Sequence, residues 1–290
     1  NFAMDLEEVY MTTKLDGQAT FFLPFNMGNG NGVTAGAGNP VFEDKYSVSY
    51  MWEDILTKDT ILVSIMWVNN IIGSINPMKK IIEMVKSKSH AKLHVDMVQG
   101  VCKIKPDFEF NDFDLMTLTF HKIEGLKGIG ALIANKNLQI QPLFYGGHQQ
   151  NQIRPGTYDA ALIVASSKAL RINYEKMDSY YHYVHKLYNY LIDRISKLPF
   201  IDINKKGDYY SPYVLSISFK KTKGETVMHY LEENNIIVGV GSACNEKTKT
   251  LERSVYALTN SIERSYNMIR ISLSQEIDYL IEKLQELGNR

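Results

Sequence analysis

From Thr60 onward, the chain alternates between strand-like and helix-like segments, and this alternation restricts its fold more than any other feature. Residues 61–68 (ILVSIMWV) form a continuous apolar run, which is typical of a strand buried on both faces. Pro77 then opens a helix whose apolar residues share one face, namely Met78, Ile81, Ile82 and Val85. This order indicates an open α/β sheet with crossover helices, in which ligands gather at the ends of the strands.

The elements expected downstream continue this pattern. Further strands are predicted at 93–96, 115–119 and 129–134, and helices at 158–172 and about 175–198. The last third predicts strands at 213–219 and 236–240, a helix at 226–233, and a closing amphipathic helix ended by Gly288. We therefore expect three parts, which are an irregular segment over 1–58, a large α/β domain over 59–172, and a long helix with a smaller α+β domain over 173–290.

The irregular first segment contains a glycine-rich run from Met27 to Pro40 (MGNGNGVTAGAGNP). So many glycines disfavour regular structure, and a surface loop is therefore the first interpretation. A phosphate-binding loop is the alternative, but no Lys-Ser or Lys-Thr pair follows the glycines and no clear strand precedes them.

The bulk composition argues against several classes of function. The 290 residues carry 32 basic and 32 acidic side chains, so charge gives no reason to expect nucleic acid or an acidic membrane surface as a partner. The two cysteines, Cys102 and Cys244, are too few for a secreted disulfide scaffold and favour a reducing, cytoplasmic location. No apolar run approaches the ~20 residues that cross a bilayer, and the first ten residues do not resemble a signal peptide.

Two motifs place reactive groups at predicted strand ends. Lys122 lies in TLTFHKIEGLKGIG, where its amine can form an imine with a bound carbonyl compound. Thr119 and His121 come just before it and offer a hydroxyl and an imidazole to a phosphate group. Asp96 ends a strand in HVDMVQG, where its carboxylate suits a ring nitrogen and Gln99 suits a ring hydroxyl. A helix N-cap is an equally good interpretation of Asp96.

The third motif, VGVGSACNEKTK, places Cys244 between glycines and charged residues. Free cysteines are usually buried, so an exposed one near cations indicates a reactive thiol. Cys102 lies in a strand-like run and is interpreted as structural. Arg270 enters a short strand in MIRISLS and suits a carboxylate, with a solvated surface arginine as the alternative. An amine, a carboxylate and a thiol in this arrangement predict pyridoxal phosphate chemistry directed at sulfur.

Taken together, these segments resemble the NifS-like cysteine desulfurases of the class V aminotransferase group. The resemblance runs from about Thr60 to the C-terminus and rests on six motifs in order, which are VSIMWVNNIIGSINP, HVDMVQG, TLTFHKIEGLKGIGAL, GGHQQNQIRPGT, GSACNEK and IRISLS. It implies a type I pyridoxal phosphate enzyme fold and a homodimer.

The resemblance also implies a cofactor role for each matching residue. Lys122 would hold pyridoxal 5'-phosphate through an imine, while Asp96 would bind its ring nitrogen and Gln99 its ring oxygen. The phosphate would be contacted by Thr119 and His121, and by Thr157 across the subunit boundary.

The same resemblance assigns the substrate and the sulfur. Asn70 would lie over cofactor and substrate, and Arg270 would bind the carboxylate of L-cysteine. Cys244 would take the sulfur as a persulfide, which leaves L-alanine. An acceptor protein would then receive that sulfur for iron–sulfur cluster assembly or tRNA thiolation.

The chain departs from the family pattern at several places. Ile71, Phe120 and Leu126 stand where the family usually has Glu, a small residue and Pro. Residues 1–58 contain no counterpart of the Ser-Gly-Ala-Thr phosphate loop or of the histidine that stacks on the ring. Residues 1–62 instead resemble a stretch of the type I restriction enzyme motor subunit, through FFLPFNMGNGNG, GAGNP and SYMWEDILTKDTIL, with DTIL as the joint.

We therefore expect a cysteine desulfurase-like protein whose large domain is truncated at its N-terminus and whose hold on pyridoxal phosphate is weak or absent. The chain would be a chimera, or else a family member with a divergent N-terminus. A non-catalytic remnant that keeps a dimerisation surface is the main functional alternative. A restriction-system fragment and a sister pyridoxal phosphate lyase are two more, and the absence of a Walker motif disfavours the first while Cys244 disfavours the second.

Overall fold

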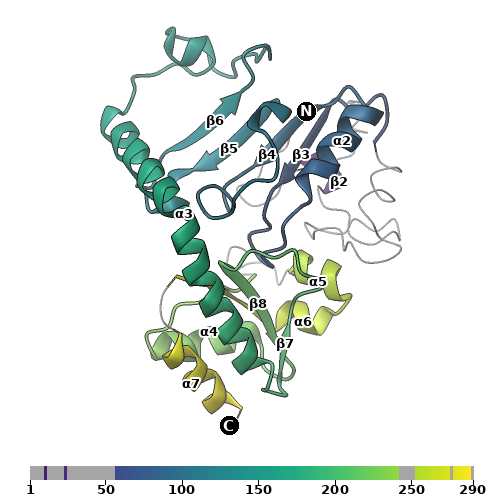
Figure 1. Cartoon of the computed structure of the whole chain (residues 1–290), viewed down its shortest axis with the longest axis vertical. Helices are drawn as coiled ribbons and strands as arrows, with labels where there is room; N and C mark the ends of the chain where they lie inside the picture. Colours follow the sequence, from purple (N-terminus) through teal and green to yellow (C-terminus); the bar gives the residue numbers. More distant parts are fainter. Residues whose placement is uncertain (1–9, 12–22, 25–55, 242–251, 275–276, 289–290) are drawn as a thin grey trace.

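The computed structural model describes residues 56–241, 252–274 and 277–288, together with the two short strands β1 (Tyr10–Met11) and β2 (Leu23–Pro24), which pair antiparallel. Figure 1 shows two lobes joined by one long helix, α3 (Ala160–Ile195). The first lobe contains a mixed sheet with a helix packed on it, and the second contains a small antiparallel sheet with four helices.

The sheet of the large lobe has the strand order β3-β4-β5-β6. Strands β3 (Leu62–Met66), β4 (Lys92–Asp96) and β5 (Leu115–Thr119) run parallel, and β6 (Gly130–Ala134) runs antiparallel to β5. Helix α2 (Met78–Lys88) connects β3 to β4, as a parallel pair requires. All four predicted strands of this lobe and the helix after Pro77 are therefore confirmed, with shifts of one or two residues at their ends.

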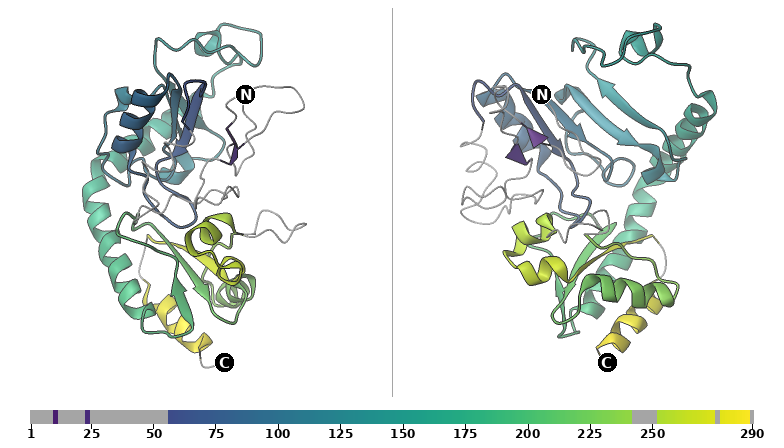
Figure 2. Two further views of the ribbon diagram at one scale, coloured as in Figure 1. Left: turned by 90° about the vertical axis from the view of Figure 1, so that its right-hand side faces the viewer. Right: turned by 180° about the vertical axis from the view of Figure 1, so that it is seen from behind.

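One face of this sheet forms the core of the large lobe. Helix α2 buries the four predicted apolar residues on it, against Val63 and Ile65 of β3 and Leu93 and Val95 of β4. Beyond the strand end, the Trp67 ring meets Phe108 edge to face, with centroids 4.9 Å apart. Burial of this apolar surface stabilises the lobe by about 25 cal/mol per Å² removed from water. Figure 2 shows α2 on this side of the sheet.

The opposite face carries a chain of polar side chains across three strands. Ser64 Oγ lies 2.6 Å from His94 Nδ1, and His94 Nε2 lies 3.1 Å from Thr117 Oγ1. The Ser64 side chain is buried, and burial lowers the pKa of His94 to about 4. The imidazole is therefore neutral at physiological pH and links β3, β4 and β5 through both of its nitrogens.

Helix α3 (Ala160–Ile195) is a single element of 36 residues, so the prediction of two helices with a break near residue 173 was wrong. Neither Gly nor Pro occurs between its ends, and nothing in the sequence stops the helix there. Asn173, near the predicted break, donates through Nδ2 to the backbone oxygens of Ala169 and Ile123. The expected boundary between 172 and 173 thus falls inside a helix that runs along both lobes (Figure 2).

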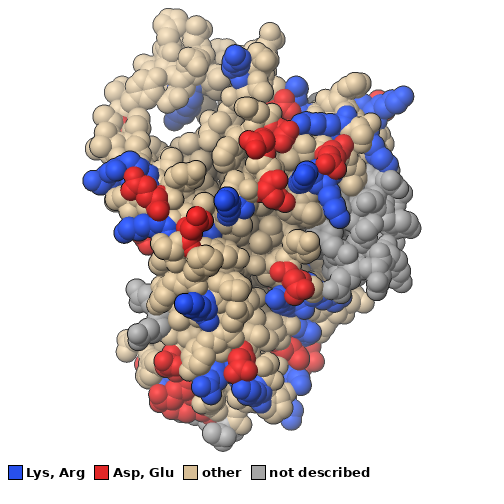
Figure 3. Space-filling view, viewed as in Figure 1, with Lys and Arg blue, Asp and Glu red and all other residues tan. Residues whose placement is uncertain are grey.

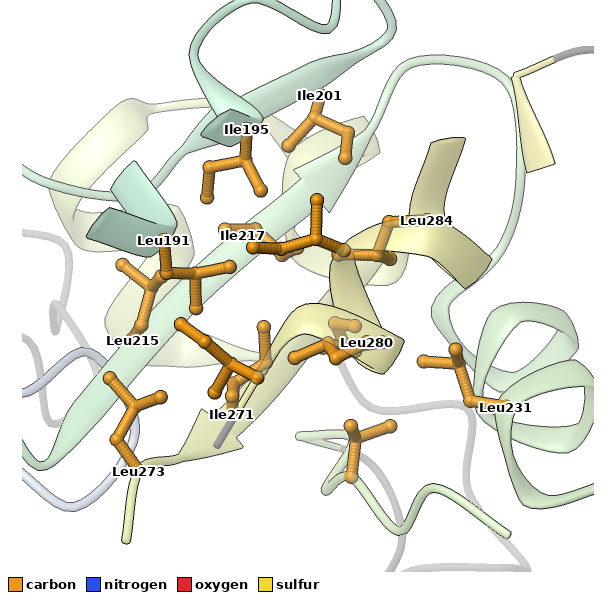
Figure 4. Close-up of a cluster of buried hydrophobic side chains, with 14 of the residues drawn as sticks. Leu191, Ile195, Ile201, Leu215, Ile217, Leu231, Ile271, Leu273, Leu280 and Leu284 are labelled. Carbon is orange, nitrogen blue, oxygen red and sulfur yellow. The ribbon is translucent and has the colours of Figure 1, made fainter. Parts of the chain in front are cut away.

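The small lobe is built on the antiparallel order β7-β8-β9, with β7 (Ile201–Ile203), β8 (Val214–Phe219) and β9 (Met268–Ser272). Its helices are α4 (Gly224–Glu233), α5 (Arg253–Thr259), α6 (Ile262–Tyr266) and α7 (Asp278–Leu287). In Figure 4, Leu191 and Ile195 of α3 point toward Leu215 and Ile217 of β8, and Leu284 of α7 closes the same cluster.

Two predictions for the small lobe need correction. Residues 236–240 do not form a strand, because only Gly239 pairs with β9, through Arg270, and Ile237 is 90% exposed. Gly288 follows α7 as expected but has a right-handed φ of −73°, so it is not a left-handed cap. Strand β7 and helices α5 and α6 were not predicted, since each is too short to show a clear period.

The lobes meet along the loop of residues 69–76. Ser211 N donates to Gly73 O at 2.7 Å, and Ile75 N donates to Tyr209 O at 2.8 Å. Gly73 has a φ of +77°, and a Cβ there would lie 2.7 Å from Val214 O, so only glycine fits this contact. Ile72 is buried in the same junction, among Val255, Leu258 and Met268.

Candidate active site at the junction of the lobes

Several predicted residues lie where parallel strands β4 and β5 end. Asp96 is the last residue of β4 and Thr119 the last of β5, and Asp96 is in register with Thr117. Chain reversal after β5 forms a short 3₁₀ helix, η4 (Phe120–Ile123), which carries Lys122. The two motifs that the sequence placed at strand ends therefore share one edge of the sheet, as parallel strands require.

The Asp96 carboxylate is half-buried and its Oδ1 accepts a hydrogen bond from Val98 N at 2.8 Å. Turns follow it, with no helix beginning there, so the helix N-cap interpretation was wrong. Burial raises the pKa of Asp96, and the Val98 N–H group opposes this rise. A carboxylate that is partly buried and accepts a single hydrogen bond from the described residues favours a cationic or N–H partner at its other oxygen.

The turn after Asp96 is held against the core of the large lobe. Gly100 packs on the Trp67 ring so closely that a Cβ would lie 2.2 Å from it, which only glycine avoids. This contact places Gln99 beside the strand end, where its Oε1 accepts a hydrogen bond from Lys103 Nζ at 3.3 Å. Cys102 lies in this turn with a φ of +56°, not in a strand as predicted, although it is buried.

Lys122 is exposed at the end of the sheet, on a 3₁₀ turn that is held by contacts of the next residue, Ile123. Ile123 is buried, its backbone oxygen accepts from Asn173 of α3, and Glu124 ends the turn with a left-handed φ of +60°. The pKa of Lys122 is lowered, first by partial desolvation and then by the charges of Arg270 and Lys127. A lysine that loses its proton more readily is a better nucleophile toward a carbonyl carbon.

Thr119 and His121 lie at the end of β5, directly before Lys122. Thr119 Oγ1 lies 2.8 Å from His121 Nδ1, and the pKa of His121 is lowered by desolvation and by the neighbouring lysines. Both side chains lie within two residues of one another at the C-terminal end of β5, so their hydroxyl and imidazole present two polar groups to one anion.

Arg270 reaches this site from the small lobe. It lies in β9, where its backbone pairs with both Ser216 and Gly239. Arg270 Nη1 donates to Asn70 O at 3.2 Å across the junction, and its Nε is buried without a hydrogen-bond partner among the described residues. The Arg270 side chain is half-exposed, but its Nε donor is buried and has no partner in the part of the chain that the structure describes. An arginine of this kind, whose charge also acts on Lys122, suits a carboxylate ligand.

The adjacent residues Asn69 and Asn70 make different contacts. Asn69 is buried and its Oδ1 accepts from the backbone nitrogens of Ile71 and Ile72, which shapes the junction loop. Asn70 is half-buried and faces the arginine through its backbone oxygen. The predicted site residue is thus at the junction, and its neighbour holds it there.

Two further predicted residues are Thr157 and Cys244. Thr157 is exposed in the segment between β6 and α3, which Figure 1 shows projecting from the sheet at the top of the large lobe. Cys244 lies outside the described residues. Conversely, sequence reasoning missed Lys103 and His94, whose only signals were their spacings of four residues after Gln99 and two before Asp96.

Comparisons with known proteins agree with this geometry. Residues 15–279 match the model of the family described as aminotransferase class-V. The chain belongs to the class V aminotransferases. The match begins at residue 15, inside the segment 1–62 that resembles a restriction enzyme motor subunit. That second resemblance stays a prediction.

Individual relatives of this class V aminotransferase narrow the comparison. A cysteine desulfurase IscS from Dictyoglomus turgidum is 31% identical over 238 residues, which cover 80% of the chain and 60% of the relative. A probable mitochondrial cysteine desulfurase from Schizosaccharomyces pombe is 33% identical over 80% of the chain and 47% of its own length. The chain therefore spans about half to three fifths of these relatives.

A solved structure confirms the expected fold. A NifS-like protein superimposes with a TM-score of 0.75 and 29% identity, covering 82% of the chain and 64% of that protein. The α/β fold of a class V aminotransferase, with a parallel-rich sheet and a smaller lobe, is thus shown. Class V aminotransferases of the cysteine desulfurase type depend on pyridoxal phosphate and act on L-cysteine.

The residues present fit pyridoxal phosphate. Asp96 is a half-buried carboxyl group with a raised pKa, which a protonated ring nitrogen would satisfy. Lys122 is an amine with a lowered pKa at the same sheet edge, and Thr119 and His121 offer polar groups to a phosphate. The buried Nε of Arg270 lacks a partner among the described residues, which suits the carboxylate of an amino acid.

Replacement of Asp96 by asparagine is expected to have two opposite effects. The raised pKa means that the ionised form costs stability above its unfolded pKa, so Asp96→Asn raises the unfolding midpoint of the cofactor-free chain at pH 7. Loss of the charged hydrogen bond weakens pyridoxal phosphate binding by about 10- to 100-fold. Thermal unfolding and equilibrium dialysis measure the two effects. A lower midpoint with unchanged binding contradicts the assigned role, and Asp107→Asn, at an exposed residue in a nearby loop, is the control.

The outer surface of the protein adds no further preference. Figure 3 shows basic and acidic side chains interspersed over the visible face. Among the described helices, none combines the length and apolar character needed to cross a membrane.

Proposed function

We propose that this chain converts L-cysteine to L-alanine with pyridoxal phosphate and carries the released sulfur as a persulfide on Cys244. The proposal is supported by the positions of Asp96 at the end of β4 and Lys122 just after β5, and by Arg270 of the small lobe, which hydrogen-bonds to Asn70 O and whose charge acts on Lys122. Amine, carboxylate and guanidinium are the groups that hold a pyridine ring and an amino acid substrate together.

Each residue contributes a separate task. Lys122 supplies the nucleophilic amine that attaches the cofactor, and its lowered pKa increases the fraction of free amine. Asp96 keeps the ring nitrogen protonated, and Gln99 addresses the ring oxygen. Arg270 binds and orients the substrate carboxylate, and Asn70 lies beside it. When bound, pyridoxal phosphate supplies the electron sink for the reaction.

Cys244 supplies the sulfur acceptor. Its thiolate attacks the sulfur of the bound cysteine, the bond between that sulfur and the β-carbon breaks, and the carbon skeleton keeps the electron pair. Protonation of that carbon yields L-alanine, and Cys244 then bears a persulfide that a thiol of an acceptor protein takes up. The step balances as cysteine plus thiol giving alanine plus persulfide, without an outside oxidant.

Binding of the cofactor is expected to be weak. Thr119 and His121 are the phosphate-facing groups that the sheet edge of this chain supplies, and Thr157 would serve the site of a second copy in a homodimer. The sequence holds no Ser-Gly-Ala-Thr loop and no ring-stacking histidine in residues 1–58. Activity is therefore expected to depend on added pyridoxal phosphate. The low cysteine content separately favours a cytoplasmic location.

The test is release of alanine from L-cysteine by the full chain in excess pyridoxal phosphate. Wild-type protein is expected to release alanine and to acquire 32 Da for one added sulfur at Cys244, seen by mass spectrometry. Cys244→Ser retains the cofactor but loses the persulfide, and Cys102→Ser, at the buried cysteine, retains both. A wild-type protein that binds the cofactor yet releases no alanine refutes the proposed activity.

A non-catalytic interaction module is the second candidate, and exposed apolar surface favours it. Leu132 and Ile133 on β6 are 53% and 45% exposed, and Leu143, Phe144 and Tyr145 follow them in the projecting segment. Surface of this kind marks contact with another protein, here a second copy or a sulfur acceptor. An inactive wild-type chain that elutes as a dimer in size-exclusion chromatography supports this candidate over the enzyme.

The resemblance of residues 1–62 to a restriction enzyme motor subunit belongs to the proposal in a narrow form. It holds that this segment joins the class V aminotransferase part near DTIL without contributing catalytic residues. Residues 15–62 are also covered by the family match, so a family member with a divergent N-terminus is the alternative to a chimera.

A further inference from the structure

Lys103 lies in the turn after Asp96 and contacts residues of both lobes. It is half-buried, whereas Lys105 two residues later is exposed. Its Nζ donates to Gln99 Oε1 at 3.3 Å and lies 5.8 Å from the centroid of the Tyr213 ring in the small lobe. Its ammonium is therefore held between the two lobes by an acceptor on one side and an aromatic face on the other.

The contact with Lys103 decides which way the Gln99 amide faces. An ammonium group has only donors, so it can pair with the amide oxygen of Gln99 and not with the NH₂ group. The oxygen is thereby turned toward Lys103, and the NH₂ group is left as the donor on the other side. A ring phenolate oxygen needs a donor, so this orientation is the productive one.

We propose that Lys103 is a positioning residue that fixes the Gln99 amide with its NH₂ group toward the ring oxygen of the cofactor. The proposal rests on the proposed function, because it concerns the same cofactor, but the contact between Lys103 and Gln99 exists without it. Lys103 would touch neither cofactor nor substrate and would act through Gln99.

The electrostatics around Lys103 are consistent with this position. Burial, together with the charge of Lys122 and against the opposing effect of Cys102, lowers the pKa of Lys103 to about 8. The charge on Lys122 thus acts on Lys103, so the two amines lie within range of each other's electrostatic field. Tyr213 faces the same ammonium, and burial and nearby tyrosines raise the pKa of its phenol, so it stays neutral beside the amine.

The first experiment needs no cofactor. Lysines of the cofactor-free chain are labelled by reductive methylation at pH 7, and the label on each lysine is measured by mass spectrometry. In Gln99→Leu the ammonium loses its acceptor, so labelling of Lys103 is expected to rise about two- to fivefold, while Lys105 is unchanged. Equal labelling of Lys103 in the two proteins overturns the proposal.

The second experiment measures equilibrium binding of pyridoxal phosphate. Lys103→Met and Gln99→Leu are each expected to weaken binding about five- to tenfold, and the double variant no more than Gln99→Leu alone. Lys103→Arg keeps a donor and restores most of the affinity, and Lys105→Met is the matched control. Additive losses, or no loss in Lys103→Met, overturn the proposal, and circular dichroism establishes that each variant is folded.

The two experiments separate failure of this inference from failure of the proposed function. If the wild-type chain binds no pyridoxal phosphate, the proposed function fails and the labelling result alone decides whether Lys103 fixes Gln99. If the wild-type chain binds the cofactor but Lys103→Met binds it equally well, the proposed function stands and the role of Lys103 is refuted.

Discussion

Replacement of Lys122 by alanine is expected to abolish covalent attachment of pyridoxal phosphate and to lower alanine release by at least about 10³-fold. Lys122 is the amine that η4 presents at the end of β5, with a pKa lowered by desolvation and by Arg270. Absorbance of the attached cofactor, borohydride reduction and peptide mapping show which lysine carries it.

Lys136→Ala is the control for this experiment, because Lys136 is an exposed lysine of the same lobe beyond β6. It should retain both the absorbance and the rate of the wild-type chain. A strong absorbance band in Lys122→Ala, or a reduced cofactor mapped to Lys103, would show that another amine performs the attachment and that the assignment of Lys122 is wrong.

Acidification is expected to destabilise the large lobe through His94. The pKa of His94 is about 4 in the folded state, below the ordinary value of 6.5. Between these pH values the imidazole is mostly neutral in the folded state and mostly protonated in the unfolded state. Stability is therefore complete above pH 6.5 and is lost as the pH falls toward 4, by about 3 kcal/mol from this group. Urea unfolding at pH 7 and pH 4 measures the difference in the free energy of unfolding.

His94→Gln removes this group, so the same pH change should cost the variant about 3 kcal/mol less than the wild-type chain. At pH 7 the variant is less stable, because the links from the imidazole to Ser64 and Thr117 are lost. His182→Gln, at an exposed histidine of α3, should keep the wild-type pH dependence. An unchanged pH dependence in His94→Gln would show that His94 is not a source of the acid sensitivity.

Local periodicity was sufficient for most elements of the fold. The four strands of the large lobe and helices α2, α4 and α7 follow directly from apolar spacing and from the position of Pro77. The break expected near Asn173 failed because its side chain bonds to the helix backbone at Ala169 instead of ending the helix. Strand β7, with three residues, becomes recognisable only by its pairing with β8.

The site shows the same division between local and distant information. Asp96, Gln99 and Lys122 were predicted as site residues because each lies in a short motif at the end of a strand. Lys103 was missed because a lysine in a polar turn carries no signal until Tyr213 and Gln99 are brought to it. The N-cap alternative for Asp96 was likewise open until the chain after it proved to be a turn.

The amino-acid sequence by itself determined the alternation of strands and helices, the family, and the chemical types of the site residues, because each depends on neighbours close along the chain. Only the tertiary structure decided that Arg270 meets Asn70, 200 residues away, and that its charge acts on Lys122. The physical reason is that burial and charge interactions depend on distances in space, and these are set by the packing of two lobes around one continuous helix.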